Sequence, residues 1–100
     1  MSRNDVTVSG GVTELEPLRY TPAGIPLLSF RLVHQSRQLE AQHERSVSLD
    51  LQVVVLGDLA REMAELAPGS NVAVRGFLAR RSLKSLSVEL HATAYKIELE

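Results

Sequence analysis

The basic side chains of this sequence are concentrated in one short segment. Residues 66–88 contain four basic residues and no acidic residue, and Arg80, Arg81 and Lys84 all lie within the stretch RRSLKS. The rest of the chain carries seven basic and twelve acidic side chains, which leaves a charge of −5, although the formal net charge of the whole is −1. Exposed charges interact weakly through water, so this separation contributes little to folding. It is typical of a local site for a polyanion.

The apolar residues on both sides of this segment predict that it is the tip of a β-hairpin. In residues 72–79, valine, glycine and leucine fall on one face, and Arg75 and Phe77 fall on the other. A second strand is predicted from residue 86 to residue 99, with a change of face near residues 92–94. The residues expected to face inward at its start are Leu86, Val88 and Leu90.

Three further strands are predicted in the first half of the chain, over residues 6–13, 28–34 and 47–56. The pair Gly10-Gly11 interrupts the first strand and predicts a bulge or a sharp coil there. A type II turn is expected between the first two strands, because TPAGIP places proline and glycine at the required positions. Residues 35–44 are polar and are interpreted as an exposed loop.

One short helix is predicted after the third strand. Asp58 is expected to cap its N-terminus, and PG at residues 68–69 to stop it. Leu59, Met63 and Leu66 have helical spacing. The order of three strands, one helix and two strands predicts an all-β fold of a single domain over residues 1–100. The predicted fold is an OB-fold, a five-stranded Greek-key barrel whose only helix lies between strands three and four.

This fold would bring dispersed basic residues together. In an OB-fold, the loop between strands four and five and the loop after strand one form the two walls of an oligonucleotide cleft. Phe30 has the parity of a core residue, so few rings remain to stack bases, and we expect salt-sensitive phosphate contacts to dominate. The candidate residues for binding single-stranded DNA are Arg80, Arg81, Lys84, Arg19, Tyr20, Arg31, Arg45, Arg37, Arg75 and Phe77.

Other kinds of chemistry find little support in the sequence. There is no cysteine, and His34, His43 and His91 are too scattered to suggest a metal site. No nucleophile or phosphate-loop motif is present, so we expect no enzyme, no cofactor and no small-molecule substrate, with a small enzyme using His34 or His91 as a remote alternative. No apolar run is long enough to span a membrane, and no secretory signal pattern is visible, so we expect a cytoplasmic protein.

Several segments resemble the primosomal replication protein N family, PriB. They are residues 17–19 (PLR), 21–26 (TPAGIP), 30–34 (FRLVH), 74–78 (VRGFL) and 90–92 (LHA). This family is related to the bacterial single-stranded DNA-binding proteins. The resemblance implies an OB-fold homodimer that binds single-stranded DNA and takes part in replication restart. It also implies two protein partners, the PriA helicase and the loading factor DnaT.

The sequence departs from this family at positions that bear on DNA binding. Tyr20 stands where some members carry a lysine, Gln35 replaces a basic residue, and the tryptophan found in strand three of some members has no counterpart near Val47 and Ser48. These departures favour an alternative, a protein-interaction OB module with weak or no DNA binding. For the homodimer, the outward-facing end of the last strand is expected to supply part of the contact, through Tyr95, Ile97 and Leu99.

Overall fold

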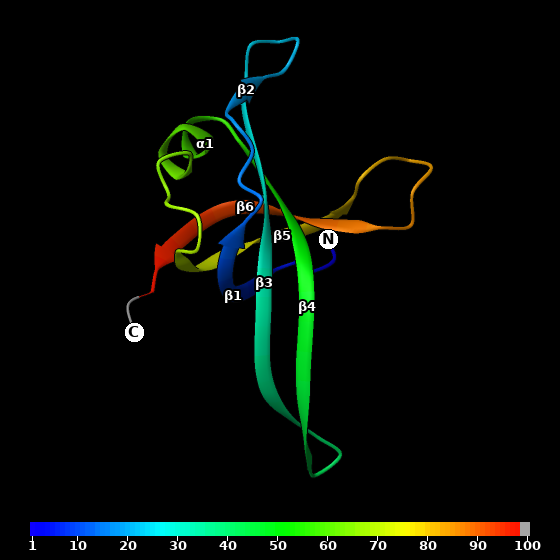
Figure 1. The fold of residues 1–100 in the computed structure, drawn as a ribbon. Helices are drawn as coiled ribbons and strands as arrows, with labels where there is room; N and C mark the ends of the chain where they lie inside the picture. Colours follow the sequence, from blue (N-terminus) through cyan, green and yellow to red (C-terminus); the bar gives the residue numbers. More distant parts are fainter. Residues whose placement is uncertain (99–100) are drawn as a thin grey trace.

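The computed structural model describes residues 1–98, which form one closed β-barrel with a short helix at one end (Figure 1). The elements are β1 (Val6–Thr13), β2 (Arg19–Tyr20), β3 (Pro26–Glu40), β4 (His43–Leu56), α1 (Asp58–Met63), β5 (Asn71–Arg80) and β6 (Val88–Ile97). The strand order is β1-β5-β6-β4-β3-β2, and pairing of β1 with β3 closes the barrel. This confirms the predicted OB-fold, with α1 between the third and fourth long strands.

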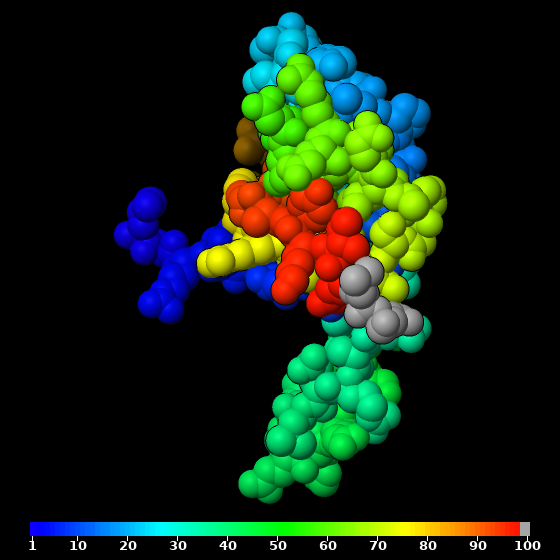
Figure 2. All heavy atoms as spheres, turned by 90° about the vertical axis from the view of Figure 1, so that its left-hand side faces the viewer, coloured from blue at the N-terminus to red at the C-terminus, as the bar shows by residue number. Residues whose placement is uncertain are grey.

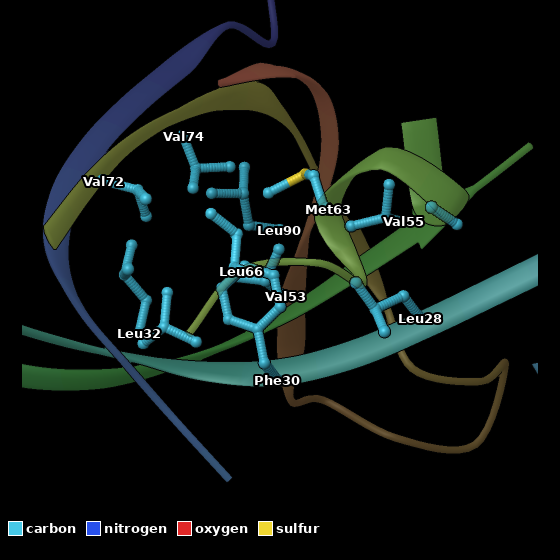
Figure 3. Close-up of a cluster of buried hydrophobic side chains, with 12 residues drawn as sticks. Leu28, Phe30, Leu32, Val53, Val55, Met63, Leu66, Val72, Val74 and Leu90 are labelled. Carbon is cyan, nitrogen blue, oxygen red and sulfur yellow. The ribbon is translucent and has the colours of Figure 1, made fainter. Parts of the chain in front are cut away.

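The barrel interior is filled by the residues whose alternation predicted it. Leu28, Phe30 and Leu32 of β3 are essentially inaccessible to solvent, and so are Val53 and Val55 of β4. Phe30 is therefore a core residue, as predicted. Figure 3 shows the side chains of α1 and the segment after it pointing into the same cluster. Those side chains are Met63 and Leu66, which cover one end of the barrel.

Two glycines allow strands to pass closer than any side chain would permit. A Cβ atom on Gly10 would lie 2.3 Å from the carbonyl oxygen of Val33, where β1 leaves β5 and joins β3. The register of β1 is unbroken at Gly10 and Gly11, so the strand has no bulge at this pair. A Cβ atom on Gly76 would lie 1.8 Å from the carbonyl oxygen of His91, beside an irregularity in the β5–β6 ladder.

The prediction of a loop over residues 35–44 was wrong. The ladder between β3 and β4 continues without a break from Leu27–Leu56 to Glu40–His43, and only Ala41 and Gln42, both with positive φ, lie between the strands. Both faces of this hairpin are solvated, so its sequence has no apolar alternation to reveal a strand. Residues 35–48, called the arm below, extend beyond the barrel as a separate lobe (Figure 2).

The helix begins and ends earlier than predicted. Gly57, with φ of 85°, is the N-cap residue, so the capping role expected of Asp58 was wrong. Asp58 is instead the first helical residue and pairs with Arg61 at 3.3 Å. The regular helix ends at Met63, and a turn in which the Leu66 N–H donates to the Met63 carbonyl at 3.0 Å keeps Leu66 buried.

The last strand changes face as predicted, but its two ends differ from the prediction. Gly76 pairs with Ala92 and Arg75 with Ala94, so Thr93 is the extra residue of a bulge. Leu86 and Val88 were expected to face the core, yet they are 91% and 48% exposed. The hairpin extends beyond the barrel at these positions, and within residues 1–98 no strand from the other side of the barrel covers the two side chains.

The prediction that Tyr95 faces outward was wrong. The side chain packs against the core, and burial together with a hydrogen bond to Glu62 raises the pKa of its hydroxyl. Ile97 is exposed, and Leu99 lies outside the described residues. Within residues 1–98, no helix is long and apolar enough to cross a membrane.

Candidate nucleic-acid interface

The hairpin tip between β5 and β6, residues 80–88, is called the finger below. Its neck is closed by the Arg81 N–H, which donates to the Ser87 carbonyl at 3.1 Å, and its tip by the Ser85 N–H, which donates to the Ser82 carbonyl at 3.2 Å. Figure 1 shows the finger projecting to the right, clear of the barrel. These backbone bonds give the finger a defined conformation.

The three cations of the finger are free of carboxylates. Arg80, Arg81 and Lys84 are all exposed, and within residues 1–98 none of them lies within 4.0 Å of an acidic side chain. Their charges are therefore uncompensated locally, as the acid-free segment predicted. An anion that approaches the finger need not displace an internal partner.

Four of the other candidate arginines already have acidic partners. Arg37 donates two hydrogen bonds to Glu44, at 2.9 and 2.7 Å, across the arm. Arg45 donates to Glu40 at 2.9 Å. The remaining two pairs are Arg75 with Asp5, at 2.9 Å, and Arg31 with Glu14, at 3.8 Å.

The Arg75–Asp5 pair also shifts the pKa values of its two groups. Two hydrogen bonds from Arg75 and the charge of its guanidinium hold the pKa of the Asp5 carboxyl below its usual range. The same pair raises the pKa of Arg75. Both side chains are more than half exposed, so the pair contributes little to folding stability.

Arg31 lies on the outer face of the barrel, on the same side as the base of the finger. It is paired with Gln52 of β4, and its Nη1 donates to the Gln52 Oε1 at 3.2 Å. One residue further along β4, Val53 pairs with Leu90 of β6. Strands are about 4.8 Å apart, so Arg31 is roughly 10 Å from the outer face of β6.

The outer face also carries a pair of stacked rings. Phe77 of β5 pairs directly with His91 of β6, and their rings are stacked with centroids 5.2 Å apart and planes 10° from parallel. Phe77 is 41% exposed, and the His91 Nε2 lies 3.7 Å from the Glu89 carboxylate. The two rings form one platform next to the finger.

The place of His91 in this platform was not predicted from the sequence, where His91 was weighed only as a metal ligand or a catalytic residue. The available signal was parity, because Phe77 precedes the half-buried Leu78 and His91 follows the buried Leu90 on adjacent strands of one hairpin. Correct pairing of β5 with β6 would have placed the two rings side by side.

The structure separates Arg19 from Tyr20. Arg19 pairs with Leu27 and therefore shares the outer face with Arg31, whereas Tyr20 pairs with the buried Pro26 and lies on the opposite face. The Tyr20 ring is 6.0 Å from the guanidinium carbon of Arg61 on α1. Arg19 joins the candidate surface, and Tyr20 lies on the helix side of the molecule.

The arm cations are remote from the finger. Arg45 precedes Val53, the β4 residue that pairs with β6, by eight residues, or about 26 Å of extended chain. Figure 1 shows the arm extending downward while the finger extends sideways. Arg37 and Arg45 therefore lie at a distance from the finger, each beside its own carboxylate partner.

The histidine in the root of the arm has a structural role. His34 lies on β3, where the arm leaves the barrel. Its Nδ1 is 2.7 Å from the Ser9 carbonyl oxygen and its Nε2 is 2.8 Å from the Ser36 hydroxyl. A carbonyl can only accept, so Nδ1 carries the proton and donates to Ser9. This bond holds β1 against β3.

Residues 1–98 contain no group of three or more histidine or acidic side chains that could hold a metal ion.

The chain matches a known protein family over most of its length. The model of a family described as "Another single-strand binding protein family" matches residues 4–94. Replication restart protein PriB of Bordetella pertussis is 43% identical over 88 residues, which cover 88% of this chain and 82% of that protein. PriB of Nitrosomonas europaea is 34% identical over 97 residues, which cover 97% of this chain and 90% of that protein.

Solved structures of PriB and of a single-stranded DNA binding protein are similar to this chain. The structure of PriB from Ralstonia solanacearum superposes with a TM-score of 0.88 at 28% identity, covering 98% of this chain and all of that one. The wild-type single-stranded DNA binding protein from Thermus aquaticus superposes with a TM-score of 0.78 at 28% identity, covering 97% of this chain and 50% of that one. The chain therefore belongs to the replication restart protein PriB family, which is related to the single-stranded DNA-binding proteins.

Proposed function

We propose that this protein binds single-stranded DNA through the finger and the adjoining outer face, and serves as an adaptor in primosome assembly during replication restart. The observation that carries this proposal is the finger itself, which presents Arg80, Arg81 and Lys84 without a carboxylate partner in the part of the chain that the structure describes. Lysine and arginine side chains supply most of the affinity of proteins for a phosphate backbone.

Binding would begin at the finger and continue across the barrel. The finger cations contact phosphates first, and Arg31 and Arg19 continue the basic path over the outer face. The Phe77–His91 platform lies beside that path and offers a ring surface to an unstacked base. Because phosphate contacts carry no sequence information, we expect weak sequence selectivity.

The ion-paired arginines would take part at a small cost. Arg37, Arg45 and Arg75 must exchange a carboxylate for a phosphate, and an exposed ion pair is worth only about 0–1 kcal/mol. These residues would therefore extend the binding surface when a long strand reaches the arm or the N-terminal segment. They would contribute less than the finger.

The same internal pairing favours a second candidate function, a protein-interaction module with little DNA binding. If the four ion pairs of Arg31, Arg37, Arg45 and Arg75 persist, the basic surface shrinks to the finger and Arg19. The membership of the PriB family supports PriA and DnaT as protein partners in either case. In both cases the proposed role is that of a binding protein in the cytoplasm and not of an enzyme.

We also propose that the protein is a homodimer, as the resemblance to PriB implied. A feature of β1 supports this proposal. From Val6 to Gly10, β1 has a strand on only one side, because β5 pairs with it there and β3 joins only at Gly11. An unpaired strand edge is a ready template for a second chain.

A titration tests the DNA-binding proposal. Fluorescence anisotropy of a labelled oligonucleotide is measured at several salt concentrations, for the wild type and for Arg80→Ala/Arg81→Ala/Lys84→Ala. Each phosphate neutralised on a single strand contributes about −0.7 to the slope of log K against log salt, so the triple variant should weaken the slope by about two units.

A second variant controls for overall charge. Arg61→Ala/Lys96→Ala removes two cations elsewhere, one on α1 and one near the end of β6, and should leave the slope unchanged. Absence of wild-type binding at low salt would eliminate the DNA-binding proposal in favour of the protein-interaction module. An unchanged slope in the triple variant would place the DNA site away from the finger.

A further inference from the structure

The finger carries two leucines that the phosphate contacts do not explain. Leu83 is 88% exposed and Leu86 is 91% exposed. A single exposed leucine is common on protein surfaces. Here two of them lie within four residues, next to the three unpaired cations, on a loop that contributes nothing to the core.

The backbone of the finger holds these leucines outward. Ser82 and Ser85 close a β-turn, so Leu83 and Lys84 occupy its two central positions. The Ser87 N–H donates to the Ser85 hydroxyl at 3.1 Å and fixes the chain on the other side of Leu86. The side chains are therefore presented by an ordered loop, which reduces the entropy lost when a ligand covers them.

We propose that Leu83 and Leu86 contact the bases of single-stranded DNA while the neighbouring cations hold its phosphates. An unpaired strand exposes the apolar faces of its bases, and leucine side chains serve other DNA-binding proteins as wedges between bases. The chain has few rings that could do this. Of its four aromatic residues, Phe30 is buried and Tyr20 lies on the helix side. The leucines supply the apolar contact that rings supply elsewhere.

The small size of the finger favours DNA bases over a protein surface as the ligand of the two leucines. A stable protein interface buries about 800 Å² on each partner, far more than two side chains at a loop tip offer. A single base can cover a single leucine. Such contacts make no hydrogen bonds, so they discriminate weakly, with a preference for thymine because its methyl group adds apolar area.

This inference rests on the proposed DNA binding, and its test separates the two. The ligands are a labelled oligothymidylate and an oligomer of the same length with an abasic sugar-phosphate backbone. The variant Leu83→Ser/Leu86→Ser should bind oligothymidylate about tenfold more weakly than the wild type, with an unchanged salt slope, because no phosphate contact is lost. Both proteins should bind the abasic oligomer equally.

Leu83→Met/Leu86→Met keeps the apolar surface and should bind oligothymidylate as the wild type does. The leucine role is overturned if the serine variant retains full affinity for oligothymidylate, or if it loses affinity equally for both oligomers. Retained affinity together with a change in the sedimentation coefficient would assign the leucines to contacts between copies of the chain. If the wild type binds neither oligomer at low salt, the DNA-binding proposal fails and the leucine role fails with it.

Discussion

Individual arginines in this chain differ in the cost of reaching a phosphate. Among the described residues, Arg80 and Arg81 have no acidic partner, whereas Arg37 and Arg75 each donate two hydrogen bonds to one carboxylate. The sequence could not distinguish these groups, since the partners Glu44 and Asp5 become neighbours only through strand pairing. The finger differs from these arginines, because its residues lie within an acid-free segment. The sequence alone shows that no carboxylate is close to them along the chain. This explains why the finger could be identified from the sequence alone.

At the residue scale, removal of the exposed ring of Phe77 and removal of the exposed ring of Tyr20 should change the affinity for DNA differently. Phe77→Ala removes half of the stacked platform on the outer face and should weaken binding to an oligonucleotide about tenfold, since base stacking is worth about 1–3 kcal/mol. Tyr20→Ala is the matched control, and its effect should be below about twofold, because its ring lies on the α1 side.

Anisotropy at constant low salt measures both effects, and circular dichroism verifies that each variant is folded. A larger loss in Tyr20→Ala than in Phe77→Ala would contradict the assignment and move the path of the strand to the helix side.

At the scale of elements, alternation identified a strand only where one face is buried. The core position of Phe30 in β3 was predicted correctly for this reason. Residues 35–44 have water on both faces, so their strand character comes from the ladder between β3 and β4 and leaves no apolar period. The outward position of Leu86 was missed for the converse reason. Its parity is that of a core residue, but the barrel ends before the finger does.

The two glycines in β1 should respond differently to the same substitution. Gly10→Ala places a methyl group 2.3 Å from the Val33 carbonyl oxygen, so β1 and β3 must separate where the barrel closes. We expect a loss of about 3 kcal/mol in the free energy of unfolding. Gly11→Ala meets only the Asn71 side chain at 3.9 Å, and its effect should stay within about 1 kcal/mol in either direction.

Urea denaturation followed by circular dichroism gives both free energies. The two variants differ by one position and share the same change in unfolded-state entropy. Equal stabilities for Gly10→Ala and Gly11→Ala would show that close approach of β1 and β3 does not hold the barrel closed.

At the scale of the whole molecule, charge and pairing are unevenly distributed. The net charge is only −1, yet the finger is purely basic, so association with DNA depends on a local field that salt will screen. Strand pairing is uneven as well: residues 6–10 of β1 pair with β5 on one side and, among the described residues, with no strand on the other. The fold and the finger could be predicted from the sequence. The open edge could not, because it depends on how far β3 overlaps β1.

The open edge of β1 gives the last prediction. Val12 exchanges backbone hydrogen bonds with residues 69 and 70, on the β5 side, and the Ser9 carbonyl accepts a bond from His34, on the other side. Backbone groups alternate along a strand, so the N–H of Thr7 points away from β5, toward the open edge. Thr7→Pro removes this donor and leaves the β5 ladder intact.

If two copies pair through this edge, the wild type should sediment as a dimer, at about twice the 11.0 kDa of one chain, and Thr7→Pro should shift toward the monomer. Thr7→Val keeps the N–H and is the control that should remain dimeric. Sedimentation velocity measures all three proteins at the same concentration. A wild type that sediments as a monomer would eliminate the homodimer, and a fully dimeric Thr7→Pro would place its contact on a different surface, because no second chain could then be using the Thr7 donor.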